Sequence, residues 1–169
     1  MGQDKAALPW GNVSLLDHMT HLLLTVAGEV RIIGRGTFPD TIPGKGPLGG
    51  IVTALEVSDR EANIVLGVDL PMLSPAFLKK FHSRFLASPK PLLACLVESR
   101  FPLCLGIRKI LLADLERRVE SGNLAVHGFI EASNPEILEE DELKAMGADR
   151  SMFANLNTPE DWIKLRQKG

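Results

Sequence analysis

The stretch Asn63-Ile64-Val65-Leu66-Gly67-Val68-Asp69-Leu70-Pro71 decides the predicted fold. Its apolar residues are continuous rather than alternating, which is typical of a strand buried on both faces of a parallel sheet. Asp69 follows this strand directly, and Pro71 stiffens the backbone of the turn. Ligands of α/β sheets bind beyond the carboxyl ends of the strands, so a functional carboxylate is expected at this position.

Strands and helices alternate on both sides of this stretch. Helical periodicity after Ser14, with Asp17 three residues later as in a capping box, predicts an amphipathic helix that ends at Gly28. Ser74-Pro75 supplies an N-cap and a first-turn proline for another helix. Further strands are predicted over residues 30–33, 92–97 and 102–107, weaker ones at 137–138 and 152–156, and helices over 51–57, 110–119 and from 158, with an ambiguous stretch at 123–133.

This alternation predicts a doubly wound α/β fold with a mostly parallel sheet. The 169 residues are 45% hydrophobic and 24% charged, which suits a single domain over residues 1–169 and excludes a disordered or fibrous protein. A chain of this length buries enough surface to fold without disulfides or a structural metal.

Composition and charge exclude several partners. With 19 Lys and Arg against 21 Asp and Glu, the net charge of −2 gives no basic footprint for nucleic acid or an anionic membrane. The apolar runs are far shorter than the roughly 20 residues that cross a bilayer, and no signal peptide is recognised. Cys95 and Cys104 stand among apolar residues, which favours buried reduced thiols of a cytoplasmic protein over a disulfide or a metal pair.

Two residues are candidates for binding a phosphorylated ligand. Asp69 could hold Mg²⁺, because this hard cation commonly takes one or two protein carboxylates and completes its shell with water and substrate phosphates. The alternative is that Asp69 caps the turn. Lys5 lies in a glycine-bearing segment that suits a phosphate clamp, and its alternative is a solvated surface lysine.

Glycine and proline are dense between residues 34 and 50, which predicts a long loop without regular structure. Within it, residues 43–50 read Pro-Gly-Lys-Gly-Pro-Leu-Gly-Gly. Glycines let backbone amides approach a ligand, and the helix that follows offers its amino terminus to negative charge. The spacing is not that of a Walker A loop, and a structural turn is the alternative. Asn155 and Asn157 could read a ligand, or Asn157 could simply cap the last helix.

Together these segments resemble the molybdenum cofactor guanylyltransferase family of nucleotidyltransferases. The resemblance rests on the order and spacing of motifs over almost the whole chain, namely residues 1–8, 14–16, 43–50, 68–74, 101–103 and 153–161. The Gly-Pro-Leu-Gly-Gly element and the closing Asn-x-Asn-Thr-Pro favour the guanylyl enzymes over cytidylyl or sugar-phosphate relatives.

The resemblance implies transfer of GMP from Mg·GTP to the terminal phosphate of the molybdopterin cofactor, with release of pyrophosphate. Lys5 would hold the GTP phosphates and Asp69 would bind Mg²⁺. Asp40 would match an acidic residue of the nucleotide site, Pro47, Leu48, Gly49 and Gly50 would border guanine and ribose, and Asn155 and Asn157 would face the pterin. GTP and molybdopterin would be the substrates, and molybdenum-insertion proteins or molybdoenzymes would be transient partners.

The sequence departs from the family pattern in two places. Family members begin with an apolar strand and a glycine-rich loop that ends in Arg-Met-Gly, whereas this sequence starts at that Met. In a sheet of order 3-2-1-4 the first strand is central, so two neighbouring strands are expected to lack a row of hydrogen bonds. Gly34 stands where many relatives carry an asparagine. Two alternative functions therefore stay open. One is a nucleotidyltransferase of another substrate, cytidylyl or sugar-phosphate, and the other is a shortened, non-catalytic relative that binds the cofactor or has a regulatory role.

Overall fold

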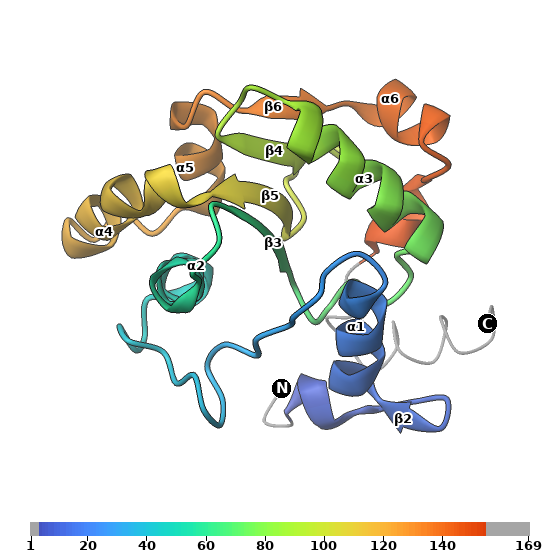
Figure 1. The fold of residues 1–169 in the computed structure, drawn as a ribbon, viewed down its shortest axis with the longest axis horizontal. Coiled ribbons are helices and arrows are strands. Elements are labelled where there is room, and N and C mark those ends of the chain that lie inside the picture. Colours follow the sequence, from blue (N-terminus) through green and yellow to red (C-terminus); the bar gives the residue numbers. More distant parts are fainter. Residues whose placement is uncertain (1–3, 155–169) are drawn as a thin grey trace.

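The computed structural model describes residues 4–154, and its centre is a four-stranded sheet in the order β3-β5-β4-β6 (Figure 1). The strands are β3 (Ala62–Leu66), β4 (Leu92–Cys95), β5 (Cys104–Arg108) and β6 (Glu136–Leu138). β5 is antiparallel to both β3 and β4, whereas β6 is parallel to β4. The predicted α/β class is confirmed, and the sheet is mixed because one of its four strands is reversed.

A tight hairpin explains the reversed strand. Val97 and Arg100 pair across a two-residue turn in which Glu98 has φ of 48° and Ser99 has φ of 60°. Two-residue turns with positive φ at both central positions join antiparallel strands, whereas parallel strands need a longer crossover. The two strands predicted on either side of Ser99 therefore form, but they run in opposite directions.

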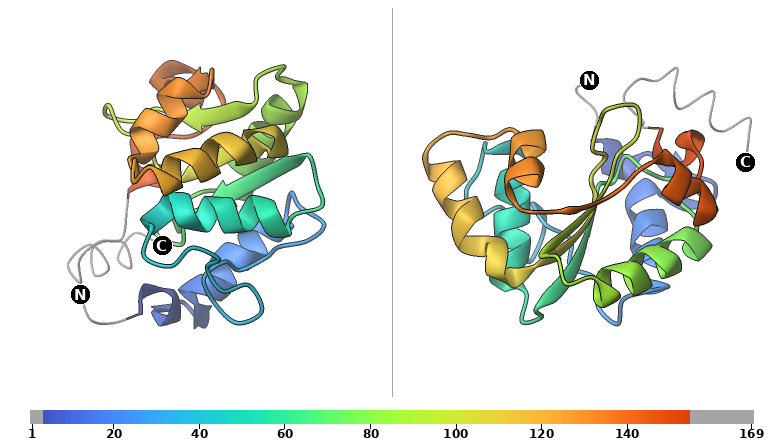
Figure 2. Two further views of the ribbon diagram at one scale, coloured as in Figure 1. Left: turned by 90° about the vertical axis from the view of Figure 1, so that its left-hand side faces the viewer. Right: turned by 90° about the horizontal axis from the view of Figure 1, so that it is seen from above.

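Helices cover both faces of the sheet, as the view from above shows (Figure 2). One face carries α1 (Leu15–Leu24), α3 (Pro75–Ala87) and α6 (Glu140–Ala145), and the other carries α2 (Gly46–Val57), α4 (Leu112–Glu120) and α5 (Val126–Ala132). Short 3-10 turns η1 (Lys5–Ala7), η2 (Lys109–Leu111) and η3 (Arg150–Phe153), and a small hairpin of β1 (Pro9–Trp10) and β2 (Val13–Ser14), complete the described chain. None of the described helices has the length and apolarity needed to span a bilayer.

Local capping signals predicted the helix starts. The Ser14 hydroxyl accepts a hydrogen bond from the Asp17 N–H at 3.0 Å, and that of Ser74 accepts one from the Phe77 N–H at 3.1 Å. The ambiguous stretch at 123–133 contains α5. The weak strand expected at 152–156 is not formed within the described residues, where η3 ends at Phe153. The helix expected from residue 158 lies outside them.

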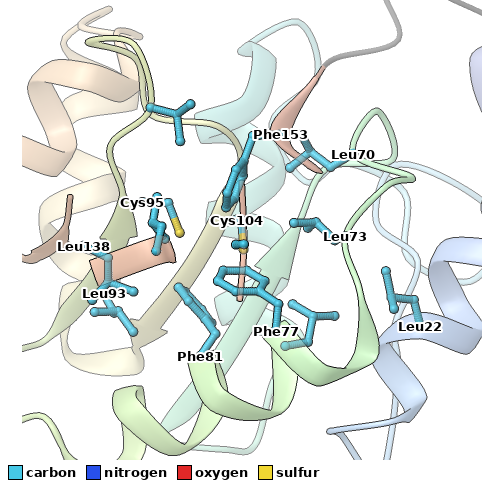
Figure 3. Packing of buried hydrophobic residues seen from close by; sticks show 14 of the residues in the cluster. Leu22, Leu70, Leu73, Phe77, Phe81, Leu93, Cys95, Cys104, Leu138 and Phe153 are labelled. Atoms are coloured by element: carbon cyan, nitrogen blue, oxygen red, sulfur yellow. The ribbon is translucent and has the colours of Figure 1, made fainter. Parts of the chain in front are cut away.

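Buried phenylalanines of α3 form the core between that helix and the sheet (Figure 3). Phe77 and Phe81 are fully buried in the same cluster as Cys95 and Cys104. Both thiols are free, as predicted. The hydrogen bond with the Cys104 thiol and burial raise the pKa of the Cys95 thiol, so Cys95 stays protonated and acts as a small apolar side chain.

Two further local predictions were wrong. Residues 30–33 form no strand, and apart from the isolated pairing of Ile33 with Phe38 they lie beside β3 without a ladder. The reason is that a strand exists only through a hydrogen-bonded neighbour, and within residues 4–154 β3 pairs with β5 alone. The edge of β3 that faces residues 30–34 is therefore open.

The second wrong prediction is the start of α2, which begins at Gly46 rather than at residue 51. Pro47 lies in the first turn of the helix, where a backbone N–H has no partner to lose. Gly49 is required for packing, because an added Cβ would stand 2.9 Å from Lys45 Cβ and 3.0 Å from the Ile42 carbonyl oxygen. These residues belong to the helix, and the irregular loop is correspondingly shorter.

Candidate active site

A cavity of about 410 Å³ lies where α1, α2 and the open edge of β3 meet. It brings together residues from most of the segments predicted to bind nucleotide. Its lining includes Ala6, Gly34, Asp40, Pro47, Gly50 and Gly67. The candidate residues Lys5 and Asp69 are sequence neighbours of Ala6 and of Val68, which also lines the cavity.

A second cavity of about 530 Å³ continues along the same edge. The two share Val30 and Arg31 on one side and Ile64 and Val65 of β3 on the other. A groove therefore follows the open edge of β3 over its length, with apolar walls from α1 and α2 on either side.

Asp69 is half-buried at the carboxyl end of β3. Its carboxylate forms no hydrogen bond or ion pair with any other described residue, so it does not cap the turn. The side chain packs back toward the strand, since a Cβ added at Gly67 would stand 2.6 Å from Asp69 Oδ1. Because no described residue pairs with it, the Asp69 carboxylate is available as a ligand for a cation.

Three contacts hold the backbone around Asp69. The Gly67 N–H donates to the Leu103 carbonyl oxygen at 2.7 Å, and the Leu70 side chain is fully buried in the core. On the far side, His18 Nε2 of α1 lies 2.9 Å from the Pro71 carbonyl oxygen, which can only accept, so Nε2 is the donor. His18 is not among the candidate residues of the sequence analysis, because its hydrogen-bond partner is 53 positions away along the chain.

Lys5 lies in η1, which is fixed by Asp4. The Asp4 carboxylate accepts from the Ala6 N–H at 3.2 Å and forms a two-pronged ion pair with the Arg35 guanidinium. The hydrogen bond from Arg35 holds the pKa of the Asp4 carboxyl below its ordinary value. Lys5 is half-buried and has interactions of its own. Arg35 was not predicted, yet it connects the Lys5 segment to the turn that lines the cavity.

Gly34 and Asp40 form one unit on the wall of the cavity. Gly34 has φ of +80°, a left-handed conformation that favours glycine, and its N–H donates to the Phe38 carbonyl oxygen at 2.8 Å. A Cβ at position 34 would stand 3.3 Å from Asp40 Oδ1. The carboxylate of Asp40 thus occupies the space beside residue 34, which is a physical reason for glycine where the family pattern has asparagine.

The predicted nucleotide loop divides into two parts. Pro47 and Gly50 line the cavity, whereas Leu48 is fully buried in the core and Gly49 is buried against Ile42 and Lys45. The side chain of Leu48 therefore supports the first turn of α2 rather than facing a ligand. No described side chain caps that helix start, so its amino-terminal N–H groups and positive dipole end are available to an anion. Asn155 and Asn157 lie outside the described residues.

The donor set fits a magnesium ion that is shared with a substrate. Within the described part of the chain, no three His, Cys, Asp or Glu residues gather to hold a metal by themselves. A single carboxylate such as that of Asp69, which no residue within 4–154 pairs with, suits Mg²⁺, which keeps several waters and takes substrate phosphates as its other ligands.

Comparison with known proteins decides the family. Residues 1–135 match the family model described as the MobA-like NTP transferase domain. The chain belongs to this family. This match confirms the family that the sequence motifs resemble, and with it the nucleotidyltransferase class. We refer to the protein below as the MobA-like chain.

Two curated relatives carry a more specific name. The molybdenum cofactor guanylyltransferase of Xanthomonas euvesicatoria is 31% identical, over 98% of this chain and 87% of the relative. The probable molybdenum cofactor guanylyltransferase of Carboxydothermus hydrogenoformans is 27% identical, over 98% of this chain and 88% of the relative.

Solved structures share the fold of the MobA-like chain. The molybdopterin-guanine dinucleotide biosynthesis protein A of Archaeoglobus fulgidus superimposes with a TM-score of 0.76 at 18% identity, over 99% of this chain and 93% of the other. A Mycobacterium tuberculosis protein in complex with manganese superimposes with a TM-score of 0.66 at 13% identity, over 98% and 93%. These likenesses confirm the α/β architecture.

Proposed function

We propose that the MobA-like chain transfers GMP from GTP to the terminal phosphate of molybdopterin, which yields the guanine dinucleotide form of the cofactor and pyrophosphate. The names of the curated relatives support this assignment. The observation that carries it is the carboxylate of Asp69, which pairs with no described residue and stands at the end of β3, beside a cavity lined by Asp40 and the start of α2.

GTP would bind in this cavity. Pro47 and Gly50 would border guanine and ribose, with Gly49 and Leu48 holding the helix start in place beneath them. The α-, β- and γ-phosphates would lie between Lys5 and the amino terminus of α2, because both offer positive charge. From the family resemblance, Asn155 and Asn157 would contact the pterin.

Mg²⁺ is the metal that the site would hold, through Asp69 and the phosphates of GTP. Bound there, the ion would offset phosphate charge and act as a Lewis acid. Asp69 orients that charge, because its own position is limited by Gly67 and by the anchored turn around Leu70 and Pro71.

The reaction requires no protein base. A terminal phosphate oxygen of molybdopterin attacks the α-phosphorus of GTP, and the bond to the oxygen that bridges the α- and β-phosphates breaks, so that pyrophosphate leaves with the electron pair. The protein must hold two polyanions in line and shield their repulsion. Lys5 and the first turn of α2 do so by stabilising charge on the leaving pyrophosphate. We expect this reaction to take place in the cytoplasm, where contact with molybdenum-insertion proteins or molybdoenzymes would pass the product on.

Calorimetry of the purified protein with Mg·GTP, Mg·CTP and Mg·ATP tests the proposal. Binding of Mg·GTP in preference to the other two is the expected result. Preference for CTP would overturn the guanylyl assignment. Mass spectrometry after incubation with Mg·GTP and molybdopterin distinguishes an enzyme from a protein that only binds these molecules. A non-catalytic protein would bind GTP without forming the dinucleotide or pyrophosphate.

A further inference from the structure

His18 of α1 connects this helix to the turn that carries Asp69. Its Nε2 donates to the Pro71 carbonyl oxygen at 2.9 Å, and no other described group donates to that oxygen. The other side of the ring packs on Trp10, with the ring centroids 5.4 Å apart and the planes inclined by 37°. The ring is thus held on one side by an aromatic contact and uses its other side to bind a backbone carbonyl.

The hydrogen bond between His18 and Pro71 matters because Asp69 lies between two anchored positions of the backbone. Gly67 is fixed to the sheet through Leu103, and Pro71 is fixed to α1 through His18. Asp69 is midway between them, with no hydrogen bond of its own to any described residue. The direction of its carboxylate therefore depends on the backbone at both ends of the turn.

We propose that His18 is a positioning residue, which orients the Asp69 carboxylate by holding the Pro71 carbonyl group. This inference rests on the proposed role of Asp69 in binding the metal–GTP complex. His18 lines neither of the two cavities, so we assign it no direct contact with substrate or metal. The proposal assigns the effect to the Nε2–H donor and not to the size or the aromatic character of the ring.

Two substitutions separate the donor from the ring. His18→Phe keeps a ring against Trp10 but removes the hydrogen bond to Pro71. His18→Gln loses the ring, yet its side-chain amide N–H can reach the place of Nε2 and donate to the same carbonyl. His21→Leu is the matched control, because His21 is an exposed histidine of the same helix, and its Nδ1 hydrogen-bonds with the Asp17 carbonyl oxygen of α1 and with no other described residue.

The readout is Mn²⁺ binding in the presence of GTP, followed by electron paramagnetic resonance, together with kcat and KM for GMP transfer. Loss of one hydrogen bond is expected to weaken Mn²⁺·GTP binding by roughly three- to tenfold in His18→Phe. His18→Gln should stay within about twofold of the unsubstituted protein, and His21→Leu should be unchanged. Thermal melting of each variant checks that the fold is retained. Hydrogen exchange of residues 69–73 without ligand should be faster in His18→Phe only.

The opposite pattern would overturn the proposal. If His18→Phe binds Mn²⁺·GTP normally while His18→Gln loses binding, the ring contact with Trp10 is what matters and the donor is not. Unchanged binding in both variants would also refute it. Asp69→Asn distinguishes this failure from failure of the proposed function, since normal Mn²⁺·GTP binding in that variant would remove Asp69 itself from the site.

Discussion

The Cα of Gly67 lies directly against the carboxylate of Asp69, so that a Cβ at position 67 would stand 2.6 Å from Oδ1 and 3.2 Å from Leu103 Cβ. Glycine is required here because of close approach, and its backbone is not in the left-handed region. The last residue before the turn, Gly67, therefore sets how far the Asp69 carboxylate can fold back onto β3. Such a contact is visible only once the turn is built.

Gly67→Ala should damage the site more than the fold. The carboxylate end of Asp69 is free to rotate away, so the protein yields there first, whereas Leu103 must shift by only a few tenths of an ångström. The resulting displacement of the Asp69 carboxylate is expected to lower kcat/KM for GMP transfer by roughly 10- to 100-fold. Gly28→Ala is the control, because nothing lies within 4 Å of a Cβ at that position. Equal activity of both variants would show that the Gly67 contact does not position Asp69.

Asp69→Asn keeps the shape of the side chain and removes its charge. Because no described residue pairs with this carboxylate, the fold loses little and the melting temperature should stay nearly constant. Turnover should fall by roughly 10²-fold or more, the scale of one preorganised electrostatic group in an active site. Asp141→Asn, on an aspartate whose side chain is 99% exposed, serves as the comparison and should remain active. Transfer at a normal rate in Asp69→Asn would exclude it as the metal ligand.

The sequence predicted correctly those helices and strands whose signals, such as a capping residue or an apolar run, lie within the element itself or next to it. The caps at Ser14 and Ser74 and the apolar run of β3 each lie within a few residues of the structure they specify. The position of Asp69 followed from the end of that strand. The α2 start was misplaced because glycine density favours a loop, although Gly49 serves close packing in a helix.

What the sequence could not predict depends on contacts between distant residues. Asp4 and Arg35 are 31 positions apart, and no periodicity indicates that they form an ion pair beside the cavity. The failure of residues 30–33 to form a strand has the same origin, since strand pairing is decided by the neighbour and not by local composition. The reversed direction of β5 depended on the turn at Glu98 and Ser99, where neither residue is a glycine or an asparagine.

The open edge of β3 predicts an alternating pattern of hydrogen exchange. The Gly67 N–H donates to the carbonyl oxygen of Leu103, which precedes β5. Backbone N–H groups at alternate positions of a strand point the same way, so those of Val65 and Asn63 also point toward β5 and donate to it. The amides of Ile64 and Leu66 point toward the groove instead. In a protein of these 169 residues, they should exchange at least about tenfold faster than those of Asn63 and Val65, because groups without hydrogen bonds lack protection. Uniform protection across all four amides would show that another segment covers this edge.

Glu136 of β6 predicts how stability responds to acid. Burial raises the pKa of its carboxyl, but hydrogen bonds from Ser88 and Arg84 outweigh burial and hold the pKa below its ordinary value of 4.5. A carboxyl with a lowered pKa in the folded state stabilises the protein above its unfolded pKa, and that stabilisation is lost as pH falls through the folded pKa. Glu136→Gln should therefore cost about 1 kcal/mol at pH 7, or about 2–4 °C in melting temperature.

The difference between Glu136→Gln and the unsubstituted protein should shrink as the pH falls from 4.5 through the lowered pKa of the folded Glu136 carboxyl, because both side chains are uncharged below that pKa. Melting curves recorded between about pH 3 and pH 7 measure it directly. Glu120→Gln provides the reference, since Glu120 is exposed at the end of α4 and forms no ion pair with the described residues. A destabilisation of Glu136→Gln that stays constant over the whole range would mean that shape and not charge holds β6 to α3.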